Sequence, residues 1–90
     1  MRRTLIAHVE NVPGLLARVD GLLRRHSIPV ESLVFDAVAT PARLTITARA
    51  SAEAAALVVR QMRRFEDVRD VQEATPESAH ETVARLRAAR

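Results

Sequence analysis

Apolar residues alternate or cluster over four stretches of the chain, which predicts four strands. Residues 4–9 form a short run rich in β-branched and aliphatic side chains. Residues 43–50 alternate strictly between apolar and polar positions, as in a strand with one face in a core. Residues 30–39 predict another strand, and the turn at residues 40–42 joins the two into an antiparallel hairpin. Residues 66–74 predict a last strand, whose many charges suit a sheet edge.

Two stretches repeat apolar residues at helical spacing. The first covers residues 14–26, and the Ser27-Ile28-Pro29 segment ends it because the residue before a proline avoids the α region. We interpret Gly21 inside this helix as the place where the helix lies close on a sheet. The second helix begins at Ser51, a good N-cap residue, with Glu53 in its first turn. Its expected buried stripe is Ala55, Val58, Val59, Met62 and Phe65.

The resulting element order is β-α-β-β-α-β. This order predicts an α+β, ferredoxin-like sandwich in which a four-stranded antiparallel sheet carries two helices on one face. We assign residues 1–75 to this domain and residues 76–90 to a C-terminal helical extension. The other face of the sheet is expected to be open, and apolar residues that point towards it indicate that something covers it. Those residues are Ile6, His8, Val34 and Val38.

The segment between the first strand and the first helix, residues 10–16, is the candidate binding site. Asn11 tolerates unusual dihedrals, Pro13 favours a helix start, and Gly14 leaves the backbone bare. A helix N-terminus with free N–H groups suits a carboxylate. The same composition also makes an ordinary structural helix start, so the residues alone leave both interpretations open. A small apolar rim beside the turn would suit an aliphatic amino acid; it consists of Val12, Leu15 and Leu16.

The amino-acid composition narrows the size of the core, the chemistry and the partners that we expect. The chain has 90 residues and only two aromatic side chains, Phe35 and Phe65, which predicts one domain with a thin core that favours oligomerisation. It has no cysteine, so it has no disulfide framework and no thiolate metal site. Nothing resembles a secretory signal or a membrane span, so we expect a cytoplasmic protein that does not bind a membrane. All 14 basic residues are arginine and none is lysine. Together with the many alanines, this indicates the codon bias of a GC-rich genome rather than selection for phosphate binding, so we expect no nucleic-acid partner.

Several functions of this fold are excluded by residue type. An RNA-recognition module needs aromatic residues on its central strands, and the predicted central strands, around Ile6 and Ile46, contain none. A copper chaperone needs a cysteine pair, and the chain has no cysteine. A hydrolase needs a convergent acid, base or nucleophile, but the turn has no ionisable group after Glu10. His8 stands alone among apolar neighbours, and we interpret it as a structural or interface histidine rather than a ligand or base. We therefore expect a binding module without catalytic residues, metal or cofactor.

Short segments in a characteristic order carry a resemblance to a known family. They are Met1-Arg2-Arg3-Thr4-Leu5, Glu10-Asn11 with Gly14, Ala17-Arg18-Val19 with Gly21-Leu22, Val30-Glu31-Ser32-Leu33, Leu44-Thr45-Ile46, and Asp67-Val68 with Val71. With these segments the chain resembles the amino-acid-sensing ACT domain. It is most similar to the small regulatory subunits of acetolactate synthase, an enzyme of branched-chain amino-acid synthesis.

The resemblance implies a function and a binding site. Members of the family form homodimers by joining two sheets into one of eight strands, and they act on the acetolactate synthase large subunit, which carries the thiamine cofactor. Their effector is usually valine. Carried over by position, Asn11 and Gly14 hold the backbone of the amino acid. Ile28, Pro29 and Val30 of the partner subunit close the pocket.

The chain departs from the family at two points. Many members have an asparagine where this chain has Pro29, so a polar contact and a backbone N–H are lost there. Longer members carry a further domain, whereas this chain continues only with residues 77–90. The short members activate the catalytic subunit and respond weakly or not at all to valine. The alternative is a free-standing ACT-like amino-acid sensor or dimerisation module without an acetolactate synthase partner.

Overall fold

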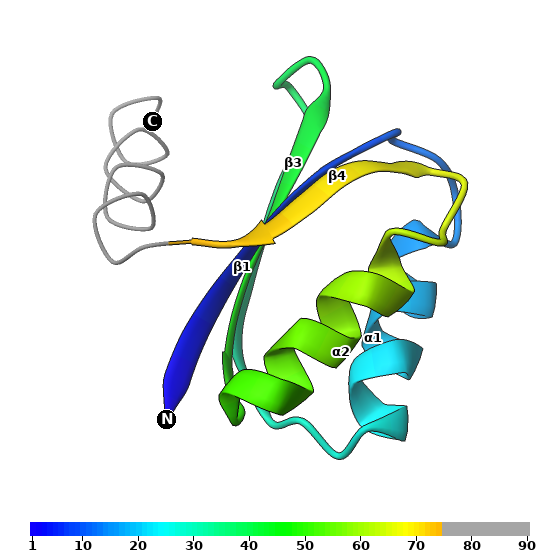
Figure 1. Ribbon diagram of the computed structural model, residues 1–90. Coiled ribbons are helices and arrows are strands. Elements are labelled where there is room, and N and C mark those ends of the chain that lie inside the picture. Colours follow the sequence, from blue (N-terminus) through cyan, green and yellow to red (C-terminus); the bar gives the residue numbers. More distant parts are fainter. Residues whose placement is uncertain (75–90) are drawn as a thin grey trace, which may run out of the picture.

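The order of strands and helices confirms the prediction from sequence. The structure is a computed structural model that describes residues 1–74, so the predicted extension at residues 76–90 lies outside the described residues. The elements follow one another as β1 (Arg2–Val9), α1 (Leu15–Arg25), β2 (Val30–Asp36), β3 (Ala42–Arg49), α2 (Ala52–Met62) and β4 (Val68–Glu73). This is the βαββαβ order of the ferredoxin-like sandwich, drawn in Figure 1.

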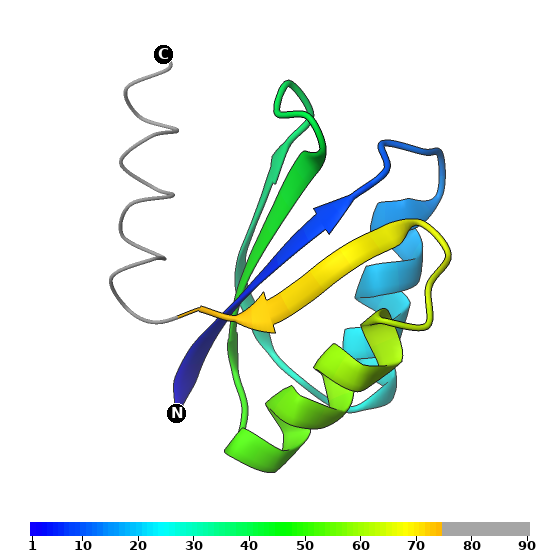
Figure 2. The same ribbon diagram turned by 45° about the horizontal axis from the view of Figure 1, so that its top comes forward.

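The four strands form one antiparallel sheet in the order β2-β3-β1-β4. Both helices lie on the same face of this sheet, as the two views in Figures 1 and 2 show. The strands β2 and β4 are therefore the edges, which confirms the edge position predicted for the charged last strand. Each edge strand has a register shift, at Val30/Ser32 in β2 and opposite His8/Val9 for β4.

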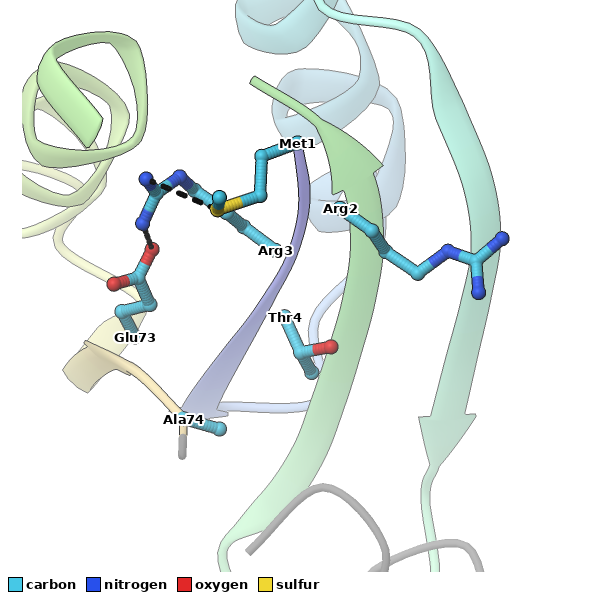
Figure 3. A pocket seen from close by; sticks show the side chains of 6 residues that line it. All are labelled: Met1, Arg2, Arg3, Thr4, Glu73 and Ala74. Atoms are coloured by element: carbon cyan, nitrogen blue, oxygen red, sulfur yellow. Dashed lines mark hydrogen bonds and ion pairs between the residues drawn. The ribbon is translucent and has the colours of Figure 1, made fainter. Parts of the chain in front are cut away.

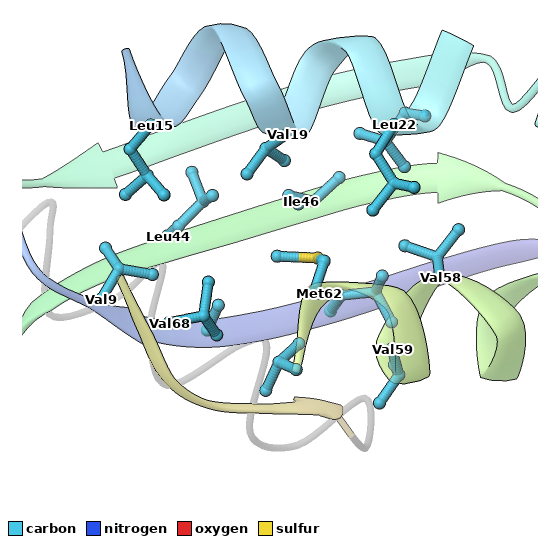
Figure 4. Close-up of a cluster of buried hydrophobic side chains, with 14 of the residues drawn as sticks. Val9, Leu15, Val19, Leu22, Leu44, Ile46, Val58, Val59, Met62 and Val68 are labelled. Carbon is cyan, nitrogen blue, oxygen red and sulfur yellow. The ribbon is translucent and has the colours of Figure 1, made fainter. Parts of the chain in front are cut away.

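The core lies between the sheet and the two helices, and aliphatic side chains fill it (Figure 4). Alternate residues of the central strands point into it, which confirms the faces predicted for residues 5–9 and 44–48. The side chains of Leu15, Val19 and Met62 come down from the helices and are fully buried. Leu, Val and Ile thus replace aromatic residues in the core, and Phe35 and Phe65 pack only at its margin.

The strand predicted for residues 30–39 is shorter than expected. It ends at Asp36, whose Oδ1 accepts hydrogen bonds from the backbone N–H groups of Val38 (3.1 Å) and Ala39 (3.2 Å). An aspartate that caps the following amides in this way favours a turn over further strand. Val38 therefore does not lie on the open sheet face as predicted, but is 91% exposed in the β2–β3 turn.

The interpretation of Gly21 was also wrong. A Cβ built at this position would meet no atom within 4 Å, so the glycine does not allow close contact with the sheet. Gly21 lies instead on the outer side of α1, in a groove between the two helices. Among the described residues, no helix is long and apolar enough to cross a membrane.

Candidate functional site

Helix α1 begins without any side-chain cap. Its N-cap residue is Gly14, in the left-handed region at φ 84°, and no side chain of residues 1–74 accepts a hydrogen bond from the first turn. A residue with a Cβ is strained at this φ, so the backbone conformation, and not a lack of space, favours glycine here. The position beside Gly14 is open, because an added Cβ would meet nothing within 4 Å. A ligand can therefore approach this part of the backbone.

Two backbone amides at the start of α1 remain available, whereas those just before them are bonded. The N–H of Val12 donates to the Glu10 carbonyl at 3.0 Å, and that of Leu15 donates to the Val12 carbonyl at 3.4 Å. Within residues 1–74, by contrast, the amides of Leu16 and Ala17 have no acceptor. No acidic residue stands in the first turn of α1 to neutralise its positive end. The helix start is thus electrostatically suited to an external anion.

The turn is fixed to the loop between α2 and β4 and to the start of β4 itself. The N–H of Glu10 donates to the Asp67 carbonyl at 2.8 Å, and Nε of Arg69 donates to the Glu10 carboxylate at 2.6 Å. Arg18, on the second turn of α1, forms an ion pair with the Asp67 carboxylate. Two pairs of charges and one backbone bond therefore hold the free amides in place before any ligand arrives.

These anchoring residues were not recognised as part of the site from the sequence. Arg18 and Asp67 belonged to segments that carry the family resemblance, but no role was assigned to either. The signal in the sequence was that residues 10–18 and residues 67–69 carry opposite charges. Glu10 can pair with Arg69. Arg18 can pair with Asp67. Such a signal becomes specific only when the sheet order places β4 beside β1.

The apolar rim of the turn differs from the predicted one. Leu15 is 1% exposed and packs in the core, so its side chain is not available to a ligand. Val12 is half-buried and packs against the same core. Leu16 is 38% exposed and is the rim residue most open to contact. Asn11 and Pro13 are also exposed.

The second group of predicted site residues lies at the other end of α1. Ile28 is buried in the core, while Pro29 and Val30 are exposed where β2 begins. The 11 residues of α1 separate them from Gly14 by about 16 Å along the helix axis. One chain therefore does not bring the two groups together, and a shared site needs a second copy.

The start of β2 offers a surface for such a copy. This edge strand exposes two large apolar side chains, Val30 (37% exposed) and Leu33 (36% exposed). Next to them Glu31 accepts hydrogen bonds from Arg2 (2.7 Å) and Arg49 (3.3 Å). The hydrogen bond from Arg2 lowers the pKa of the Glu31 carboxyl below its usual value, and Arg49 adds to the effect. The edge thus combines a strand backbone that pairs with no further strand of the described part of the chain, exposed aliphatic residues and a neutralised charge.

A separate hollow of about 390 Å³ lies where β1 begins, at the end of the sheet away from the turn. Figure 3 shows Arg3 turned towards Glu73, while Arg2 extends the other way towards β2. The guanidinium of Arg3 is already bonded to Glu73 (2.9 Å) and to the Ala50 carbonyl (3.1 Å). Its donors therefore serve the structure, and this hollow lacks the free amides of the turn.

Metal-binding and catalytic groupings were not expected from the sequence. Over residues 1–74, no three His, Asp or Glu side chains come close enough to hold a metal ion. His8 lies on β1 with its Nδ1 at 2.7 Å from the Asp70 carboxylate of β4. This cross-strand pair agrees with the structural role that we favoured for the histidine.

The sheet order and the two helices on one face place the domain in the ferredoxin-like class, to which ACT domains belong. The family follows from sequence: a model described as AHAS small subunit-like ACT domain matches residues 5–70, and the chain belongs to this family.

Individual relatives agree with this assignment. A probable acetolactate synthase small subunit from Archaeoglobus fulgidus is 32% identical over 89 residues, covering 97% of this chain and 56% of that protein. The chain therefore spans little more than half the length of this curated relative. The crystal structure of an acetolactate synthase small subunit from Thermotoga maritima matches with a TM-score of 0.74 at 22% identity, over 84% of this chain and 48% of that one.

The fold extends beyond these subunits. The ACT domain of a GTP pyrophosphokinase from Chlorobium tepidum matches with a TM-score of 0.70 at 11% identity, over 82% of this chain and 97% of that domain. At such identities the likeness concerns the fold alone. The function must therefore be argued from the family and the site.

Proposed function

We propose that this chain is a non-catalytic regulatory small subunit of acetolactate synthase. It acts as a homodimer that binds the catalytic large subunit, raises its activity and takes up a small amino acid, with valine or another branched-chain amino acid as the effector. The observation that carries the proposal is the start of α1, where unbonded amides and a left-handed glycine face open space in a chain of this family.

The proposed site forms between two copies of the chain. Pairing of the β2 edges would continue the sheet across the dimer and cover the aliphatic side chains of Val30 and Leu33. It would also bring residues 28–30 of one copy towards the turn of the other. The amides of Leu16 and Ala17 would receive the effector carboxylate, with Asn11 and Gly14 against its backbone.

Pro29 limits the affinity of this site. A proline supplies neither a side-chain amide nor a backbone N–H, so the effector has fewer donors than an asparagine would give at the same position. Loss of one buried hydrogen bond costs about 1 kcal/mol, or roughly fivefold in affinity. We therefore expect weak binding of the effector, with activation of the large subunit as the main role.

Activation would follow from differential binding. A small subunit that binds the active conformation of the large subunit more tightly than the inactive one shifts the equilibrium towards activity. An effector that changes this preference then regulates the enzyme, without a catalytic group in the small subunit.

The first experiment tests the partner. The full chain is mixed with the large subunit of acetolactate synthase from the same organism, and both co-elution and the rate of acetolactate formation are measured. We expect a complex and a higher rate. Separate elution with an unchanged rate would remove the subunit role and favour the free-standing sensor.

The second experiment tests the pocket with a matched pair of variants. Gly14→Asp and Gly14→Asn place side chains of equal size at the same left-handed position, and both residue types tolerate this conformation better than most. Only the aspartate adds a negative charge beside the proposed carboxylate site. Titration calorimetry with valine, leucine and isoleucine should show weaker binding for Gly14→Asp than for Gly14→Asn. Equal affinities would place the effector elsewhere.

A further inference from the structure

A groove of about 310 Å³ runs between the two helices, on the side away from the sheet. Four residues of α1 line it, namely Arg18, Gly21, Leu22 and Arg25. Gln61 and Phe65, at and just after the end of α2, form the opposite wall. Neither the turn nor the β2 edge contributes to the lining, so the groove is distinct from the proposed effector site.

The charges of the groove have one sign. Its two ionisable lining residues are arginines, and no carboxylate is among the lining residues. Arg18 is held by the Asp67 carboxylate and lies with its guanidinium 5.7 Å from the centre of the Phe65 ring. Arg25 is exposed and, within residues 1–74, forms no ion pair and no side-chain hydrogen bond. The groove therefore carries positive charge that its own surroundings neutralise only in part.

The middle of the groove is free of polar side chains from α1. Gly21 lies midway between the two arginines, and a Cβ added there would meet nothing within 4 Å. Leu22, 3% exposed, lies at the bottom and the half-buried Phe65 at the side. An apolar side chain of a partner would therefore have both space and apolar contacts here. Glycine makes the helix less stable at this position than alanine would, so the open space is kept at a cost in helix stability.

We propose that this groove is a docking site for an acidic peptide segment of the acetolactate synthase large subunit. The segment places one carboxylate on Arg18, another on Arg25, and an apolar side chain over Gly21 between them. This proposal rests on the proposed function, because it names the surface through which that partner is held. It concerns a different part of the molecule from the effector site.

The spacing of the two arginines favours a peptide over a small anion. Seven residues along a helix correspond to about 10 Å, and residues four apart on one face of an extended chain lie about 13 Å apart, a span that two long arginine side chains can reach. A single small carboxylate reaches one arginine at a time, whereas an extended segment with acidic residues four apart reaches both and turns the residue midway between them towards Gly21. The apolar centre of the groove matches a side chain and does not match the sugar-phosphate backbone of a nucleic acid.

The docking site is joined to the effector turn through Arg18. The backbone N–H of Arg18 donates to the Gly14 carbonyl at 3.1 Å, and its side chain is paired with Asp67. The Asp67 carbonyl in turn accepts from the Glu10 amide. A partner seated on Arg18 is therefore one helical turn away from the bare amides, which gives the two sites a direct physical connection.

The main test fills the groove without weakening the fold. Gly21→Leu occupies the space over the groove, and leucine is a better helix former than glycine, so the melting temperature should stay equal or rise. Binding of the full chain to the large subunit, measured by surface plasmon resonance, should weaken by roughly tenfold or more. Gly21→Ala is the control, since it stabilises the helix in the same way while adding only one methyl group.

A second pair of variants tests the charge. Arg25→Glu reverses the charge of a lining residue, whereas Arg24→Glu makes the same change in net charge on the neighbouring residue outside the lining. Arg24 is 80% exposed and pairs with Asp20, so its replacement costs little stability. Arg25→Glu should weaken binding by roughly tenfold, and Arg24→Glu by no more than about threefold.

The outcomes separate this proposal from the proposed function. If the wild-type chain binds the large subunit and Gly21→Leu binds equally well, the groove is not the docking site, while the subunit role stands. If the wild-type chain does not bind at all, both proposals are overturned. A 20-nucleotide single-stranded DNA of arbitrary sequence should not bind. If it binds the wild-type chain and Arg25→Glu abolishes that binding, the groove belongs to nucleic acid and the proposal is wrong.

Discussion

The two helices have the same length but begin in opposite ways. Helix α2 starts at Ser51, whose Oγ accepts a hydrogen bond from the Ala54 amide at 3.1 Å, and Glu53 stands in its first turn. Helix α1 starts at Gly14, with no side-chain cap and no acidic residue in its first turn. Both are 11 residues long and pack on the same face of the sheet.

The difference separates a helix start that serves stability from one that leaves its donors free. The side-chain cap and the acidic residue of α2 satisfy and neutralise its N-terminus. The start of α1 forgoes both, and its stability must come from packing instead. Leu15, the first residue of α1, is 1% exposed in the core, which supplies that packing. Each side of this comparison can be altered by a single substitution.

The largest effect is expected from Leu15→Ala. Removing a fully buried leucine side chain leaves a cavity, which costs about 2–5 kcal/mol. Chemical denaturation of the full chain should show this loss in the free energy of unfolding. The neighbouring Leu16 is the matched control, because it is 38% exposed and Leu16→Ala should change stability by no more than about 0.5 kcal/mol. Similar losses for both would mean that packing does not hold the start of α1.

A smaller effect is expected from Ser51→Ala. The substitution removes the acceptor of the Ala54 amide and should lower the free energy of unfolding by about 1 kcal/mol. Ser51→Asp keeps a capping oxygen and should restore most of that stability. Neither change should alter the affinity for an amino acid, since the proposed site lies at α1. A parallel loss of amino-acid binding in Ser51→Ala, measured by calorimetry, would contradict the division of roles between the two helix starts.

Local patterns predicted the elements of this fold well, because each depends on residues close in sequence. The alternation of residues 44–48 and the helical spacing of residues 15–23 each reflect a single buried face. Errors arose where a polar side chain bonded to the backbone, or where the prediction depended on which neighbouring element a residue faces. Asp36 ended β2 early, and Gly21 faced the groove rather than the sheet.

The candidate site was predictable only in part. Gly14 and the bare helix start follow from the local sequence, since glycine is the residue that tolerates a left-handed N-cap. The loss of Leu15 from the rim does not follow, because a helical stripe does not say which of two adjacent leucines faces the core. The anchoring of the turn by Asp67 and Arg69 depends on the neighbouring strand β4 and on more than fifty residues of intervening chain.

The smallest change should affect stability and binding in opposite directions. Ala17 is exposed at the third position of α1, where a glutamate can accept from the Gly14 amide and interact with the positive end of the helix. Ala17→Glu should therefore raise the free energy of unfolding by about 0.3–1 kcal/mol. The same carboxylate occupies the place proposed for the effector, so calorimetry should show weaker binding of the amino acid. Ala17→Gln is the control, since it fits the position without the charge and should retain more of the affinity. If Ala17→Glu stabilises the chain and leaves amino-acid binding unchanged, the bare start of α1 does not hold the effector carboxylate.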